Sequence, residues 1–134
     1  MSAAPRDQEI LERNQAMLDS VARGDWSAYA SFCHTDLSCF EAETEGVLAE
    51  GLTFHLFYFQ PPVTTSVEPP NPPTNQVTMA RPHLRWLGDD AVVLSYTRLT
   101  QHWHDGSAHT SRCCETRIWQ RLDGQWLQVH VHRS

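Results

Sequence analysis

The sequence predicts an α+β fold in which N-terminal helices pack on one face of a curved antiparallel sheet. Apolar residues recur at helical spacing near the start of the chain, whereas the second half consists of strand-like segments separated by turns that contain Asp and Gly. The length of 134 residues is that of one ordinary domain. We therefore expect residues 1–134 to form a single domain.

The first helix is predicted over residues 7–23, between Pro5, which suits a helix start, and Gly24, which suits a helix end. Its apolar stripe consists of Ile10, Leu11, Met17, Leu18 and Val21. Asp25 is a suitable N-cap for a short second helix, which carries Trp26, Tyr29 and Phe32. These two helices supply the apolar faces that the sheet is expected to cover.

The segment between the helices and the predicted sheet holds a brief strand, an acidic turn, a third helix and a loop. The strand runs through Ser38–Phe40 and the acidic turn through Glu41–Glu45. The third helix, Leu52–Phe59, is apolar on almost every side, which predicts that it is buried. Residues 60–75 contain six of the eight prolines, so this proline-rich loop is expected to be exposed and partly extended.

The second half of the chain predicts an antiparallel meander. Its turns carry Gly88-Asp89-Asp90, Asp105-Gly106 and Asp123-Gly124, which are hairpin turn residues. The strands that they separate are Gln76–Leu87, Ala91–His104, Thr110–Arg121 and Trp126–Arg133.

Arg98, Arg117 and Arg133 lie inside these strands, where arginine is uncommon because a buried guanidinium needs a partner. If the turn between the second and third strands has an even number of residues, Arg98 and Arg117 share one face of the sheet. A three-residue turn with a bulge at 123–125 would add Arg133, with Glu115 as a neighbouring counter-charge. The cluster is either an anion site or a buried ion-pair network. The residues by themselves favour the network, because paired charges are the usual reason for buried arginine.

Composition argues against several classes of partner. The net charge is −6 and all ten basic residues are arginine, with no basic stripe, which argues against nucleic acid and anionic membranes. There is no run of about 20 apolar residues and no apolar stretch of a secretory signal at the start. The cysteines match neither a zinc motif nor a disulfide framework, and they indicate reduced thiols in the cytoplasm. They are Cys33, Cys39, Cys113 and Cys114.

No metal ion or other cofactor is expected. His102 and His104 share one strand face, as do His130 and His132, and two such imidazoles are able to approach one ion. The sequence places no third carboxylate or thiolate beside either pair. Polar alternation along a solvated or interface face is therefore the favoured interpretation of these histidines.

Several segments, in order along the chain, resemble the association (hub) domain of calcium/calmodulin-dependent protein kinase II. They read FEAE at 40–43, LAEGLTFHLFYF at 48–59, YTRLTQ at 96–101, ETRIWQRLDGQW at 115–126 and VHVHRS at 129–134. The similarity runs from about Gln8 to the last residue. The proline-rich loop departs from the family, because it is several residues longer than the loop usual at that place.

The resemblance implies a cone-shaped fold similar to that of nuclear transport factor 2. It also implies a non-catalytic, self-assembling scaffold whose subunits close into two stacked rings, commonly dodecamers or tetradecamers. A deep pocket in the family accepts small carboxylates and kinase-type, acidic peptide segments. The positions that line it match His55, Arg98, Arg117 and Arg133 of this sequence.

The alternative on this fold is a small enzyme of the isomerase or cyclase type that acts on an anionic substrate. His55 would be its general base, since imidazole titrates near neutrality. The three arginines give the pocket positive charge in excess, however, and no carboxylate accepts a proton there unless Glu41 or Glu43 turns inward. Such a pocket suits the binding of an anion better than the abstraction of a proton.

Overall fold

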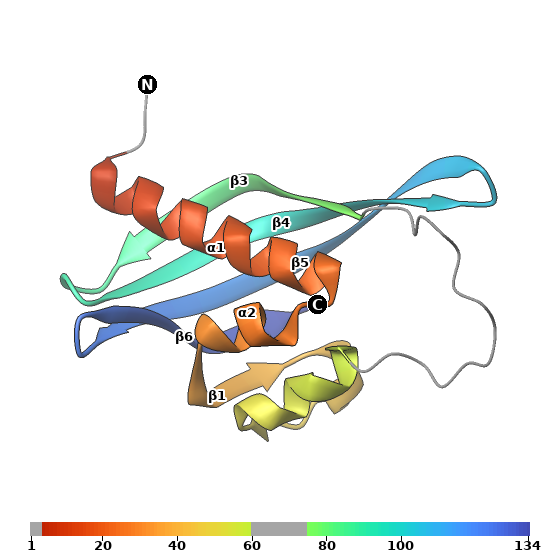
Figure 1. Cartoon of the computed structure of the whole chain (residues 1–134). Coiled ribbons are helices and arrows are strands. Elements are labelled where there is room, and N and C mark those ends of the chain that lie inside the picture. The colour runs from red at the N-terminus through yellow and green to blue at the C-terminus, as the bar shows by residue number, and fades with distance from the viewer. Residues whose placement is uncertain (1–3, 60–74) are drawn as a thin grey trace.

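The computed structural model describes residues 4–59 and 75–134. The proline-rich loop predicted at 60–75 lies, apart from its last residue, outside the described residues. Two layers are visible in Figure 1, with helices α1 and α2 over one face of a long, curved sheet. The predicted α+β class is confirmed.

Helix α1 (Pro5–Arg23) begins with its proline in the first turn and ends at Gly24, whose φ of 70° gives a left-handed C-cap. Ile10, Met17 and Leu18 of the predicted stripe are 0% exposed. The rest of the stripe packs, partly buried, against the same core. The predicted helix and its buried face are therefore confirmed.

Helix α2 (Trp26–Ser31) is capped by Asp25, whose Oδ1 accepts the N–H of Ala28 at 3.1 Å. Strand β1 (Cys33–Phe40) follows directly, so it is longer than the predicted Ser38–Phe40. The early start of β1 leaves no loop between the second helix and the sheet.

The segment after β1 is compact. A 3-10 helix, η1 (Ala42–Thr44), occupies the predicted acidic turn, and the short strand β2 (Ala49–Glu50) pairs antiparallel with β1. The third helix is present as η2 (Leu52–Phe59), but as a 3-10 helix that lies beside β1 in Figure 1. His55 in η2 is 2% exposed, in agreement with the predicted burial.

The sheet has the order β2-β1-β6-β5-β4-β3 among the described residues. The predicted meander is confirmed as β3 (Gln76–Trp86), β4 (Ala91–His104), β5 (Ser107–Leu122) and β6 (Gln125–Arg133). Strand β1, however, pairs with β6 in parallel, so the prediction of a wholly antiparallel sheet is wrong. No hairpin turn joins β1 to β6, and no local turn residues therefore set the direction of that pairing.

The hairpin between β4 and β5 brings two of the arginines to one face. Its Asp-Gly turn has two residues, both with positive φ, and pairs Arg98 with Cys113. Residues directly opposite each other share a face, and alternation along β5 carries that face on to Glu115 and Arg117. The common face predicted for Arg98 and Arg117 is confirmed.

Arg133 joins this face through a β-bulge and not through the turn that the sequence suggested. The turn between β5 and β6 has two residues instead of the expected three. The pairing of β6 with β5 skips Val129, which is the extra residue of the bulge. The bulge reverses the alternation of the residues that follow and places Arg133 directly opposite Glu115.

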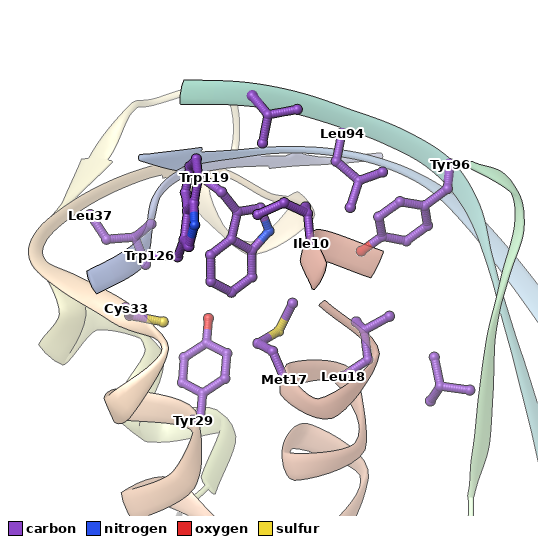
Figure 2. Close-up of a cluster of buried hydrophobic side chains, with 12 residues drawn as sticks. Ile10, Met17, Leu18, Tyr29, Cys33, Leu37, Leu94, Tyr96, Trp119 and Trp126 are labelled. Carbon is purple, nitrogen blue, oxygen red and sulfur yellow. The ribbon is translucent and has the colours of Figure 1, made fainter. Parts of the chain in front are cut away.

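The core lies between α1 and the sheet. Figure 2 shows Ile10 and Met17 of the helix close to Trp119 of β5. Asn14, which is 0% exposed, donates its Nδ2–H to the Tyr96 hydroxyl at 3.1 Å and accepts the Trp119 Nε1–H at 3.0 Å. These buried hydrogen bonds fix the helix on the sheet next to the arginine cluster.

No helix among the described residues has the length and apolar character needed to cross a membrane. All four cysteines lie in described segments, and all four are free thiols.

Candidate functional site

A cavity of about 280 Å³ opens between η2, the acidic turn and the sheet. The four residues predicted for the site, His55, Arg98, Arg117 and Arg133, all line it. The whole lining consists of Val21, Tyr29, Glu41, Glu43, His55, Phe59, Arg98, Arg117 and Arg133. The structure therefore brings together the whole predicted set, together with two carboxylates.

Arg117 lines the cavity and is 3% exposed. Its Nε donates to Glu115 Oε1 and to the Tyr96 hydroxyl, each at 3.0 Å, and its Nη1 donates to Gln128 Oε1. The Tyr96 hydroxyl donates in turn to the same oxygen of Glu115. These contacts hold the guanidinium in one orientation, as a buried charge requires.

Glu115 pairs with two arginines at once. Arg98 Nη1 lies 3.0 Å from Glu115 Oε2, while Arg117 takes Oε1. Burial opposes the charge of this carboxylate, but the nearby Arg117 and Arg98 outweigh it and lower the pKa of Glu115 to about 2. Glu115 is therefore ionised at neutral pH, and it is the counter-charge that the sequence suggested.

Arg133 lies nearer to solvent and pairs with the acidic turn. Its Nη2 is 3.1 Å from Glu43 Oε2 and 3.7 Å from Glu41 Oε2. Glu41 and Glu43 thus turn inward, which is the exception that the sequence left open, and the expected excess of positive charge is absent. The three arginines in the lining face the carboxylates of Glu41, Glu43 and Glu115, so their formal charges cancel. The ion-pair network, which the residues by themselves favoured, is present.

His55, in η2, lines the cavity and is buried. Its Nδ1 is 2.9 Å from the Tyr29 hydroxyl, and its Nε2 is 3.6 Å from Glu41 Oε1. Burial lowers the pKa of His55, and although Glu41 opposes this, Arg117 and Arg133 reinforce it. The imidazole is therefore neutral at neutral pH.

Some residues of the site carry no clear signal in the sequence. Tyr29 and Phe59 pack in the core as expected, and they line the cavity as well, which the sequence did not predict. Gln128 is 0% exposed and bonds Arg117, but a glutamine within a strand has no distinctive pattern. The pairing of Glu41 and Glu43 with Arg133 joins segments far apart in the sequence, which no spacing rule connects.

A second hollow adjoins the first and shares Arg98 and Arg133 with it. Its volume is about 370 Å³, and it is lined by Arg98, Thr100, Ser111, Arg112, Cys113 and Arg133. The two hollows therefore meet at Arg98 and Arg133.

One group of side chains has the donor atoms of a metal site. Cys39, Glu41 and His55 each offer one donor atom, and these atoms lie within 4.8 Å of one another. The histidine pairs considered from the sequence, on β4 and β6, are not part of this group.

Comparison with known proteins gives the family. The model of the calcium/calmodulin-dependent protein kinase II (CaMKII) association domain matches residues 6–134. The type II kinase subunit delta of Oryctolagus cuniculus is 40% identical over 131 residues, which cover 96% of this chain and 24% of that protein. The chain thus spans about a quarter of the length of the curated relatives it matches.

Solved structures agree with this result. The CaMKII hub homology domain of Chlamydomonas reinhardtii superposes with a TM-score of 0.88 at 45% identity, covering 96% of this chain and 97% of that one. A nuclear transport factor 2-like protein from Salmonella enterica superposes with a TM-score of 0.70 at 20% identity, covering 95% and 88% of the two chains, which bears on the fold alone. The chain therefore has the cone-shaped fold of nuclear transport factor 2-like proteins and belongs to the CaMKII association domain family.

Proposed function

We propose that this chain is a non-catalytic, self-assembling oligomerisation scaffold. The observation that carries the proposal is the match to the association domain over residues 6–134. The assembly we propose is two stacked rings of identical subunits, twelve or fourteen in all, since closed symmetric rings arise when one interface repeats. Light scattering at low micromolar concentration tests this, and a monomeric mass would refute it.

The surface of the subunit fits association. Large apolar side chains are exposed at Trp103 near the tip of the β4–β5 hairpin, at Leu87 and at Val47, with exposed fractions of 57%, 56% and 68%. The hairpin projects beyond the rest of the sheet in Figure 1. Apolar side chains and a projecting hairpin are features that an interface between subunits covers.

Each subunit is further proposed to bind a small carboxylate, or an acidic side chain of a kinase-type peptide, in the cavity. Arg98, Arg117 and Arg133 supply the donors, because a planar guanidinium matches a carboxylate with two parallel hydrogen bonds, and His55 lines the cavity beside them. A peptide would enter through the second hollow, which meets the cavity at Arg98 and Arg133. Since each of these arginines already faces a carboxylate of the chain, an incoming carboxylate has to replace one of them.

Arg133 is the position where that replacement is easiest. Its side chain is 26% exposed and that of Glu43 is 39% exposed, whereas the side chain of Glu115 is 0% exposed. A thermal shift with dicarboxylates tests the site. We expect the shift to disappear in Arg133→Ala and to persist in Arg6→Ala, which removes an exposed arginine that pairs with Asp89 on α1's side of the molecule. A thermal shift that persists in Arg133→Ala would refute a carboxylate site at Arg133. The absence of a shift with any carboxylate would refute it too.

A small enzyme of the isomerase or cyclase type remains the second candidate. The observation in its favour is the neutral His55 with Glu41 Oε1 3.6 Å from its Nε2, because such a pair is able to relay a proton. This candidate predicts turnover of an anionic substrate that His55→Ala abolishes. A particle of dimer mass with such turnover would favour it over the scaffold.

The compartment we propose is the cytoplasm, which the free thiols of all four cysteines fit. We further propose that the chain binds neither nucleic acid nor anionic membranes, because its net charge of −6 repels polyanions.

A further inference from the structure

We propose that Cys39, Glu41 and His55 form a binding site for one divalent transition metal ion, of which zinc fits best. Their sulfur, carboxylate oxygen and imidazole nitrogen donors lie within 4.8 Å of one another. Thiolate, imidazole and carboxylate are the ligand types that zinc takes in proteins. The chemistry of the three donors thus points to a metal ion at the wall of the cavity.

The backbone that presents these donors is well fixed. Cys39 and Glu41 are two residues apart in and just after β1, so alternation directs both side chains to the same face. Cys39 pairs with Ala49 of β2 on one side and with Val131 of β6 on the other. A strand held on both edges preorganises its side chains, as a metal site requires.

The imidazole already has the second contact that metal-binding histidines use. Nδ1 of His55 lies 2.9 Å from the Tyr29 hydroxyl, so with its proton on Nδ1 the ring donates to that oxygen. Nε2 then carries a lone pair and faces the Glu41 carboxylate at 3.6 Å. A hydrogen bond from the other ring nitrogen is what orients a ligating histidine.

The distances require a small closure around the ion. Zinc bonds of ~2.0–2.3 Å place the donor atoms of a tetrahedral site roughly 3.3–3.8 Å apart. The separations of up to 4.8 Å therefore need to shorten by about 1 Å. Glu41 Oε1 already lies 3.6 Å from His55 Nε2, which is within the range of a tetrahedral site.

The fourth position of such an ion would face the cavity, since both Glu41 and His55 line it. Zinc binds the thiolate form of cysteine, so the ion displaces the proton of the Cys39 thiol on binding. The ion brings two positive charges and the Cys39 thiol loses one proton, so binding adds one positive charge to the cavity. Arg133 keeps Glu43 as its partner, at 3.1 Å. The ion and the arginines would then attract an anion together.

Cobalt(II) is the direct probe, because thiolate-to-cobalt charge transfer absorbs in the near ultraviolet and the visible bands report tetrahedral geometry. The full chain, reduced and freed of metal, is titrated with cobalt(II) alone. We expect one equivalent to give both signals and zinc to abolish them by displacement. Cys39→Ala should lose the charge-transfer band, and Glu41→Gln should weaken binding at least about tenfold. Cys114→Ala, which removes an exposed thiol, should bind like the unmodified chain.

Absence of the charge-transfer band in the unmodified chain, or its persistence in Cys39→Ala, would overturn the proposal. Cys39→Ser, which keeps the volume of the side chain, gives the same test if the alanine variant does not fold. The outcome is independent of the proposed scaffold and of its carboxylate site, because the titration needs no carboxylate and all three cavity arginines stay in place. If the cobalt(II) titration gives no charge-transfer band while dicarboxylates still raise the melting temperature, only the metal site is refuted.

Discussion

Glu43 Oε1 and Oε2 lie 3.4 and 3.1 Å from Arg133 Nη2. The most exposed of the three cavity arginines is therefore already paired with a carboxylate of its own chain. The Glu43 side chain is 39% exposed, and water is able to solvate it when it leaves. The acidic turn therefore acts as an internal competitor at the place where we propose that a carboxylate binds. The free energy of binding is therefore the difference between that of the Arg133–ligand pair and that of the Arg133–Glu43 pair which it replaces.

Removal of the competitor should strengthen binding. In Glu43→Gln the Arg133 guanidinium has lost its closest carboxylate, and we expect the affinity for a small dicarboxylate to rise by up to about fivefold, the equivalent of ~1 kcal/mol for a partly exposed ion pair. Isothermal titration calorimetry measures this. Glu45→Gln, which removes the same charge from the end of the same turn, is the matched control and should have no such effect. An unchanged or weaker affinity in Glu43→Gln would count against the competitor.

The buried pair and an exposed pair should differ in their effect on stability. Glu115→Gln leaves Arg117 and Arg98 without their shared carboxylate, and we expect the free energy of unfolding to fall by about 3–5 kcal/mol. Asp90→Asn breaks the Arg121–Asp90 pair, whose side chains are 43% and 67% exposed, and should cost no more than about 1 kcal/mol. Chemical denaturation of the two variants at equal subunit concentration compares them. Equal losses would show that the network adds nothing beyond a surface pair.

Acid should destabilise the protein through Glu115. Its pKa is lowered from 4.5 to about 2 in the folded chain, so the stability that it contributes is present above pH 4.5 and is lost as the pH falls through 2. The contribution is about 3 kcal/mol for a shift of this size. Melting temperatures between pH 5 and pH 2 should therefore fall more steeply for the unmodified chain than for Glu115→Gln. Equal falls in melting temperature for the two proteins would show that the protonation of Glu115 does not cause the loss of stability.

A second pH effect should come from His55 in a higher range. Because burial lowers its pKa below 6.5, the unfolded chain takes up the proton first, and stability falls as the pH drops below 6.5. His55→Gln should remove this part of the slope between pH 7 and 5. His34→Gln, at a histidine outside the cavity lining, is the control and should leave the slope unchanged. Burial lowers the pKa of His130 as well, so part of the slope should remain, and a slope that is not reduced at all in His55→Gln would show that His55 is not responsible.

The parity of the hairpins predicted the shared face of the arginines, whereas the pocket and His55 in its lining were predicted by the family resemblance. Two-residue Asp-Gly turns are recognisable, and alternation along the strands then places Arg98 and Arg117 on one face. The bulge at Val129, which adds Arg133 to that face, was not predicted at the right place. A bulged residue of this kind needs no glycine, so Val129 looks like any other strand residue.

Other features depend on contacts that no local pattern contains. The parallel pairing of β1 with β6 joins the first strand to the last, and neither turn residues nor periodicity sets its direction. The pairing of Glu41 and Glu43 with Arg133 follows from that neighbourhood. The balance of charge in the cavity, and with it the competitor at Arg133, therefore emerges only once the strands are placed side by side.

The mass of the native particle tests the central claim most directly. The full chain has a subunit mass of 15.3 kDa, and native mass spectrometry at low micromolar concentration resolves the number of subunits. A closed assembly of two stacked rings predicts a species of twelve or fourteen subunits that persists on dilution. A monomer or an isolated dimer over the same range of concentration would contradict the scaffold.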